Sequence, residues 1–148
     1  MKFEDFIKDG SARIVSRDIN LAKSLVKTAE RDLEFLNSLK ISENSARKIM
    51  ANYYDVLRSI LEAIAATNGY KIYSHEAFTY YLKEKGEEMT AVKFDRFRKI
   101  RNSINYYGKD ISVEETKENV EEIKKIIKHL IDKCNGELEW KNWTKKKN

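Results

Sequence analysis

The chain has 148 residues with a formal net charge of +5, and it contains no proline, one cysteine and two histidines. These few cysteines and histidines exclude an internal disulfide and make a structural zinc site unexpected, so we expect neither a metal nor a cofactor. No apolar run reaches the roughly 18 residues of a membrane-spanning helix, and no signal-peptide pattern opens the chain. We therefore expect a cytoplasmic protein of one domain, whose mild positive charge favours anionic partners.

The first half of the chain is predicted to form two long helices, because its apolar residues recur every three or four positions. This spacing places them along one face of a helix, which can then be buried. The first helix is expected near 11–39 and the second near 43–68. The first stripe consists of Val15, Ile19, Ala22, Val26, Ala29, Leu33 and Leu36, and the second of Ala46, Ile49, Tyr53, Leu57, Ile60 and Ile64.

The second half of the chain is predicted to form one short helix and two long helices. Ser74 is a suitable N-cap for a short helix near 75–85, and a basic helix is expected near 88–107. Ser112 opens a capping-box sequence, which predicts that the last helix spans 113–135.

The glycines are expected to mark the ends of these helices, because glycine readily adopts the left-handed conformation that terminates a helix. They lie between the periodic segments, at Gly10, Gly69, Gly86, Gly108 and Gly136. The connections are short, so neighbouring long helices should run antiparallel. The predicted fold is all-α, an antiparallel four-helix bundle with one additional short helix. It forms a single domain over 1–136, followed by a short basic tail over 137–148.

The most unusual stretch is "RNSINYYG", at the end of the helix predicted near 88–107. Together with the preceding basic run it supplies the candidate residues Arg98, Arg101, Asn102, Asn105, Tyr106 and Tyr107. Guanidinium groups bind phosphate oxygens, asparagine can bind a base edge or a hydroxyl, and tyrosine rings stack on bases. This composition suits a phosphodiester ligand. The alternative is a solvated helix face in which Asp95 pairs with Arg98 or Lys99.

The remaining chemically distinctive residues are more often structural. His75 is interpreted as packing at the start of the short helix, with the alternative that it faces the same groove as the candidate residues. His129 and Cys134 follow the apolar stripe of the last helix, and Tyr53 and Tyr54 are expected at a helix interface. The sequence has no glycine-rich phosphate loop, nucleophile elbow or pair of histidines at metal-binding spacing.

Three stretches resemble the HEPN domain, a helical family often found beside minimal nucleotidyltransferases or in RNA-cutting defence proteins. "ARKIMANYYDVLRSILEAIAATNGYKIYSHEAF" resembles the family's second helix and the turn after it, including its "SH" element. "FDRFRKIRNSINYYG" resembles the motif helix, and residues 113–135 resemble the closing helix. The resemblance spans about 15–135.

The resemblance implies a site around Arg101. Active members pair this arginine with a histidine after four to six intervening residues and cut RNA without metal across a dimer interface. Arg101 and Asn102 match that pattern, but the histidine positions hold Tyr106, Tyr107 and Gly108. Gly108 also occupies the position at which the toxin subgroup carries a tyrosine that receives nucleotides. A phenol, with an ordinary pKa near 10, is a poor general base, so the resemblance supports RNA or nucleotide binding better than cleavage.

We therefore expect a HEPN-like RNA- or nucleotide-binding homodimer, which could be partnered by a minimal nucleotidyltransferase. Arg98 and Arg101 would hold phosphate, and Asn102 would orient Arg101 or a ribose hydroxyl. Tyr106 would stack on a base or replace the missing histidine. Two alternatives remain: a metal-independent endoribonuclease toxin of a toxin–antitoxin pair that uses Arg101, Asn102 and Tyr106, and a helical interaction module without catalytic activity. The dimer is also suggested by six tyrosines that one small core would not easily absorb: Tyr53, Tyr54, Tyr80, Tyr81, Tyr106 and Tyr107.

Overall fold

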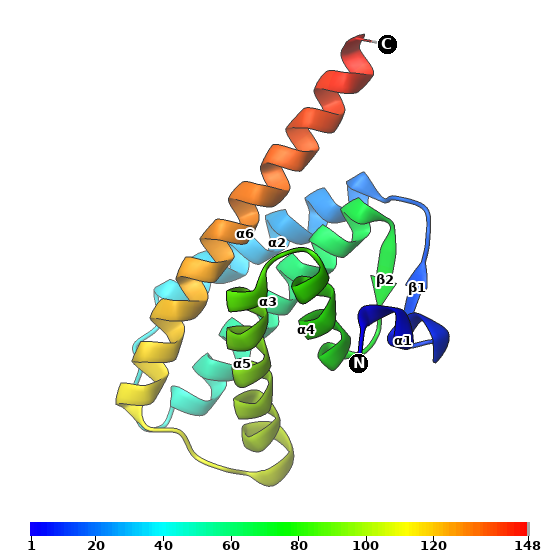
Figure 1. The fold of residues 1–148 in the computed structure, drawn as a ribbon. Helices are drawn as coiled ribbons and strands as arrows, with labels where there is room; N and C mark the ends of the chain where they lie inside the picture. The colour runs from blue at the N-terminus through cyan, green and yellow to red at the C-terminus, as the bar shows by residue number, and fades with distance from the viewer. Residues whose placement is uncertain (148) are drawn as a thin grey trace.

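The computed structural model describes residues 1–147, with side chains described up to Cys134. These residues form six helices and two short strands (Figure 1). In chain order the elements are α1 (Phe3–Lys8), β1 (Ala12–Ile14), α2 (Ile19–Asn37), α3 (Ala46–Asn68), β2 (Tyr70–Ile72), α4 (His75–Glu84), α5 (Glu88–Tyr107) and α6 (Val113–Lys147). The protein is mostly helical, as the sequence predicts.

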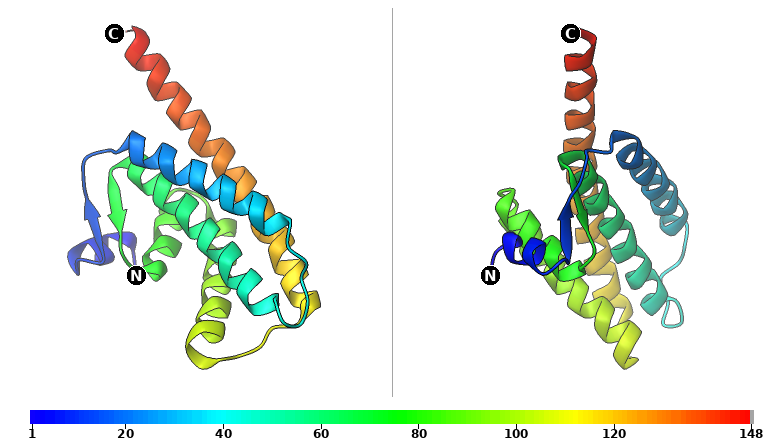
Figure 2. Two further views of the ribbon diagram at one scale, coloured as in Figure 1. Left: turned by 180° about the vertical axis from the view of Figure 1, so that it is seen from behind. Right: turned by 90° about the vertical axis from the view of Figure 1, so that its right-hand side faces the viewer.

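Helix α3 is the central element of the fold. It packs against α2, α5, α6 and β2, and α4 packs against α5 (Figures 1 and 2). The apolar spacing of α3 extends around most of its circumference, so Met50, Leu57 and Ile60 are all fully buried. A helix that is apolar on most sides must be surrounded by other elements, which explains its central position.

Most residues predicted to form the core are buried. Val26, Leu57, Ile60, Ile104, Ile123 and Ile127 are buried, whereas Leu33 and Ile100 are half-buried. The core also takes up more tyrosine than expected, since Tyr53, Tyr54 and Tyr81 are buried and Tyr80 is half-buried. Tyr106 and Tyr107 alone of the six tyrosines are exposed.

Helices α3 and α5 run in opposite directions, which brings the end of α5 against the first half of α3. Near the start of α3, the Nη2 of Arg47 donates to the carbonyl of Ile104 near the end of α5, at 3.2 Å. Further along α3, the Tyr54 ring stacks on Phe94, with 5.5 Å between the ring centres. The positive charge of Arg47, held at the C-terminal end of α5, interacts favourably with the dipole of α5.

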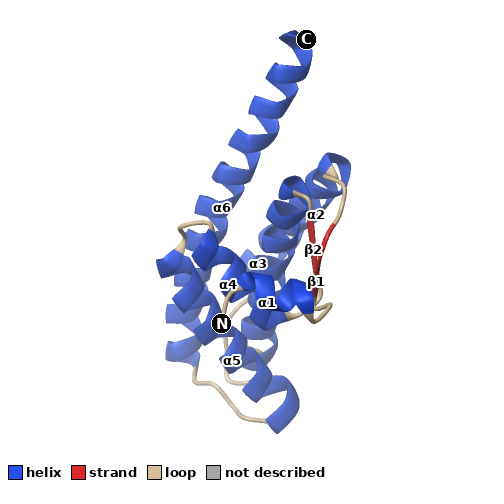
Figure 3. Ribbon diagram, turned by 45° about the vertical axis from the view of Figure 1, so that its right-hand side comes forward, coloured by secondary structure: helices blue, strands red, loops and turns tan. Residues whose placement is uncertain are grey.

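The first predicted helix is wrong over its N-terminal part, because α2 begins at Ile19 rather than near residue 11. Residues Ala12–Ile14 instead form β1, which pairs antiparallel with Tyr70–Ile72. Val15, the first member of the predicted stripe, is exposed, and Asp18 caps α2 by accepting the Leu21 N–H at 2.9 Å. The two strands lie on the side of the molecule opposite α6 (Figure 3). Helix α1 and both strands were not expected.

Of the glycines predicted to end helices, Gly69 does so and Gly136 does not. Gly69 ends α3 in the left-handed conformation, with φ +86°, and a Cβ there would lie 3.0 Å from the Val15 carbonyl oxygen. Gly136, by contrast, lies inside α6, which continues to Lys147 rather than ending near residue 135. The division of the chain into a domain over 1–136 and a tail over 137–148 remains a prediction.

Both predicted N-caps are confirmed. Ser112 Oγ accepts the Glu115 N–H at 3.0 Å, and Ser74 Oγ accepts the Ala77 N–H at 3.3 Å. The Ser74 cap makes His75 the first residue of α4. This placement positions the imidazole for the site described next.

Candidate functional site

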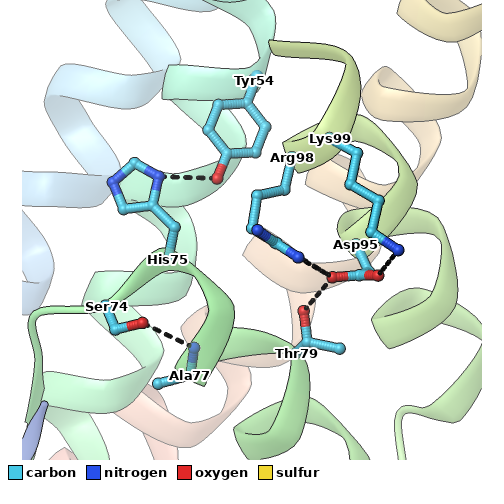
Figure 4. A network of polar contacts seen from close by, with 8 residues as sticks. All are labelled: Tyr54, Ser74, His75, Ala77, Thr79, Asp95, Arg98 and Lys99. Carbon is cyan, nitrogen blue, oxygen red and sulfur yellow. Dashed lines mark hydrogen bonds and ion pairs between the residues drawn. The ribbon is translucent and has the colours of Figure 1, made fainter. Parts of the chain in front are cut away.

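A tyrosine–histidine pair lies beneath the candidate site. Tyr54 of α3 is fully buried, and its hydroxyl lies 2.9 Å from Nδ1 of His75 (Figure 4). The two rings are tilted, with 5.8 Å between their centres. His75 therefore packs at the start of α4, as predicted, and it does so against the same part of α3 that contacts the end of α5.

Three arginines act on this pair electrostatically. Burial lowers the pKa of His75 to about 4, and the positive charges of Arg58, Arg101 and Arg98 contribute to the same shift. Burial also raises the pKa of the Tyr54 phenol, although these arginines oppose that change. Both groups are therefore neutral at neutral pH, and neither compensates the positive charge of the arginines.

Arg98 already has an acceptor. Its Nε and Nη2 donate to the same carboxylate oxygen of Asp95, at 3.1 and 2.8 Å (Figure 4). The Nζ of Lys99 lies 3.1 Å from the other carboxylate oxygen, and Thr79 of α4 donates to Asp95 at 3.4 Å. These hydrogen bonds and ion pairs lower the pKa of Asp95, although burial opposes them. The pairing of Asp95 with Arg98 and Lys99, given above as the alternative, is therefore present in the structure.

Arg101 differs from Arg98, because the described residues provide no hydrogen bond to it. Its nearest carboxylate is that of Asp55, at 3.8 Å from Nη2, and its buried Nε has no partner. Its Cζ lies 5.7 Å from the centre of the Tyr54 ring and 6.0 Å from that of Tyr106. The side chain is only 17% exposed. A mostly buried guanidinium with unused donors is an unsatisfied charge that an anionic oxygen would stabilise.

The predicted residues that follow Arg101 in the sequence lie with it on the last two turns of α5. Asn102 is half-buried and Asn105 is exposed, while Tyr106 and Tyr107 are 70% and 77% exposed. The side chains of Asn102, Asn105 and Tyr107 make no hydrogen bond to the part of the chain whose side chains the structure describes. Gly108 then ends the helix in the left-handed conformation, so both tyrosines remain on its final turn.

Arg58 is a residue of this site that the sequence analysis missed. It lies one turn after Tyr54 on α3, forms an ion pair with Glu62, and has a buried Nε without a partner. The spacing of four from Tyr54 to Arg58 and again to Glu62 is visible in the sequence. It could have indicated a polar edge on an otherwise apolar helix.

Cys134 and His129 of α6 lie in different environments. Cys134 is buried on α6, as expected. His129 is exposed rather than part of the apolar stripe, and its Nε2 lies 3.1 Å from the Glu87 carboxylate. Lys133 donates to the same oxygen at 2.9 Å. His129 therefore belongs to a surface ion cluster that links the start of α5 to α6.

Comparisons with known proteins identify no family for this chain. No protein-family model matches it, and neither a curated protein nor a solved structure does. No group of three or more histidines, cysteines and acidic residues in the described part of the chain could hold a metal ion. No described helix combines the length and the apolar character needed to cross a membrane. The site must therefore be interpreted from its own geometry.

Proposed function

We propose that this protein binds RNA or a nucleotide at the end of α5, with Arg101 as the principal phosphate-binding residue. The observation that carries the proposal is the guanidinium of Arg101, whose donors have no hydrogen-bond acceptor among the described residues. Phosphate oxygens are strong acceptors that match the fork of an arginine. Arg58 pairs with Glu62 through Nη1, but its Nε has no hydrogen-bond partner among the described residues, so it adds a second cation on the neighbouring helix.

The surroundings of Arg101 favour a nucleic acid over a simple inorganic anion. Exposed tyrosine rings such as those of Tyr106 and Tyr107 provide faces on which bases can stack. Asn102 and Asn105 provide donors and acceptors for a base edge or a ribose hydroxyl. Because Asp95 occupies the donors of Arg98, this arginine would contribute positive potential rather than direct hydrogen bonds to the ligand. His75 would help to hold the Tyr54 ring, over which the Arg101 guanidinium lies.

The proposal extends to a HEPN-like antiparallel bundle that acts as a cytoplasmic homodimer. Its support is the Arg101–Asn102 sequence near the end of α5, together with large exposed apolar side chains along α5, at Met89 and Val92. A minimal nucleotidyltransferase is the protein partner that the resemblance suggests. Light scattering at tens of micromolar should give the mass of two chains, whereas a strictly monomeric mass would contradict the dimer.

A second candidate function is metal-independent RNA cleavage. It is favoured by the position of Tyr106, an exposed hydroxyl-bearing side chain whose ring lies 6.0 Å from the Arg101 guanidinium carbon. A histidine with an ordinary pKa near 6.5 would be a better acid or base there. If the site is a nuclease site, Tyr106→His should increase cleavage of cellular RNA in EDTA, read on a gel. Unchanged RNA in both proteins would leave binding or protein interaction as the function.

The binding proposal is tested by the affinity for a fluorescent single-stranded RNA at fixed low salt. Arg101→Ala should weaken binding about tenfold, because a hydrogen bond to a charged group contributes about 1.5 kcal/mol or more. The matched control is Arg96→Ala, which removes an arginine of the same helix that pairs with Glu122 of α6. It should change the affinity by no more than about twofold. Equal effects of the two substitutions would contradict a specific role for Arg101.

A further inference from the structure

A groove of about 590 Å³ lies between the start of α2, the second half of α3 and β2, and one of its lining residues, Glu62, pairs with Arg58. This volume is within the range of about 300–1,000 Å³ that is usual for small-ligand sites. The walls are mainly apolar and include Leu21, Leu25, Ala65, Ala66, Tyr70 and Tyr73. Leu21 and Tyr73 are also well exposed, so the groove is open to solvent.

Two carboxylates interrupt these apolar walls. Asp18 uses one oxygen to cap α2, and Glu62 uses one oxygen for its ion pair with Arg58. A carboxylate offers about four acceptor positions, so both groups keep capacity for a donor on a ligand. Lys71 is a single cation in the same lining. An apolar slot with carboxylates at its edge is complementary to a flat aromatic ring that carries an amino group.

Nucleobases differ in whether they carry an exocyclic amino group. Adenine, cytosine and guanine carry an exocyclic amino group, and carboxylates accept hydrogen bonds from such groups in protein–nucleic acid complexes. Uracil has no exocyclic amino group, and its one donor on that edge, N3–H, lies between two carbonyl oxygens that a carboxylate repels. The groove therefore favours amino-bearing bases over uracil.

The groove and the arginine site share two segments of the chain. On α3, Glu62 of the groove is paired with Arg58, one helical turn from Tyr54. On the other wall, Tyr73 of the groove precedes by two residues His75, which contacts Tyr54. A nucleotide with its base in the groove would have to extend its phosphate along α3, past Glu62, to reach Arg58 and then Arg101, whose Nε atoms have no hydrogen-bond partner among the described residues.

We infer that the groove between α2, α3 and β2 binds the base of a nucleotide that carries an exocyclic amino group, while Arg58 and Arg101 bind its phosphate. This inference rests on the proposed function and specifies its ligand. Tyr73 and Leu21 would cover the faces of the base, and Glu62 would accept from its amino group.

Calorimetric titration of the full chain with AMP, UMP and adenosine tests this inference. AMP should bind about tenfold more tightly than UMP, because one hydrogen bond to a charged group distinguishes them. AMP should also bind more tightly than adenosine, since the nucleoside lacks the phosphate. Glu62→Gln should narrow the preference for AMP over UMP, and Tyr73→Ala should weaken binding of both nucleotides. The control Phe35→Ala removes an exposed aromatic residue of α2 outside the groove and should leave both affinities unchanged.

The inference is overturned if AMP and UMP bind equally, if AMP does not bind at millimolar concentration, or if neither groove variant changes AMP binding. Failure of the proposed function has a different signature. In that case Arg101→Ala would leave the affinity for single-stranded RNA unchanged, whatever AMP does. If RNA binding depends on Arg101 but AMP binding is insensitive to Glu62→Gln and Tyr73→Ala, the arginine site stands and the base subsite is wrong.

Discussion

Helix α5 contains two regions with similar residues and different environments. In its middle turns, Asp95 binds Arg98 and Lys99, and Arg96 pairs with Glu122 of α6. In its last two turns, Arg101 makes only a 3.8 Å ion pair with Asp55 and has no hydrogen bond among the described residues. The tyrosines at the end of the helix are exposed, while the aromatic residues before them are buried.

The difference shows that composition does not decide which arginine is available to a ligand. Arg98 and Arg101 lie one turn apart and both approach the Tyr54–His75 pair. Asp95, three residues before Arg98, occupies the donors of Arg98, whereas the described residues place no carboxylate equally close to Arg101. An arginine that is mostly buried yet poorly paired is costly to the fold, which is the condition expected of a binding residue.

The largest effect should come from the core beneath both regions. Leu57 is fully buried in α3, so Leu57→Ala should lower the free energy of unfolding by about 2–5 kcal/mol. Urea denaturation measures this directly. A loss below about 1 kcal/mol would mean that α3 is not the central helix on which both halves of α5 depend.

A smaller effect should separate the two carboxylates that serve the two arginines. Asp95 is 27% exposed and binds two cations, so Asp95→Ala should cost about 1–3 kcal/mol of unfolding free energy. Asp55 is 44% exposed and lies 3.8 Å from Arg101, so Asp55→Ala should cost less than about 1 kcal/mol. Equal losses in thermal or urea denaturation would contradict the distinction between the closely paired Arg98 and the weakly paired Arg101.

The fold could be predicted from the sequence where a pattern extends over several turns. The short helix and the helix at 88–107 begin and end close to the predicted residues, because Ser74 caps the first of them, Gly86 separates the two and Gly108 ends the second. The strands could not be predicted in this way. Each has three residues, and their formation depends on pairing between segments almost sixty residues apart. Gly136 likewise does not end α6, because a glycine is tolerated inside a helix at modest cost.

The candidate site could be predicted in position but not in detail. "RNSINYYG" contains Arg101, whose donors have no hydrogen-bond acceptor among the described residues. The sequence offers both Arg98 and Arg101, and only the geometry shows which one Asp95 occupies. The contact between Tyr54 and His75 joins residues that are 21 positions apart, so no local pattern announces it.

A further effect should appear in the pH dependence of stability. The folded-state pKa of His75 is lowered to about 4, against about 6.5 in an unfolded chain. As the pH falls, the His75 side chain is protonated in the unfolded state before it is protonated in the folded state. The contribution of neutral His75 to the free energy of unfolding is therefore complete above pH 6.5 and is lost as the pH falls from 6.5 through 4. His75→Gln should flatten the decline of unfolding free energy over that interval. Parallel curves for the two proteins would contradict a buried neutral histidine.

The central claim is that Arg101 is free to bind phosphate whereas Arg98 is not. It is tested most directly by the salt dependence of single-stranded RNA affinity for wild type, Arg101→Ala and Arg98→Ala, all measured below their unfolding temperatures. Each phosphate neutralised contributes about −0.7 to the slope of log affinity against log salt. We predict that Arg101→Ala reduces the magnitude of the slope by about 0.7 and that Arg98→Ala leaves it unchanged. A slope that changes for Arg98→Ala but not for Arg101→Ala would contradict the account.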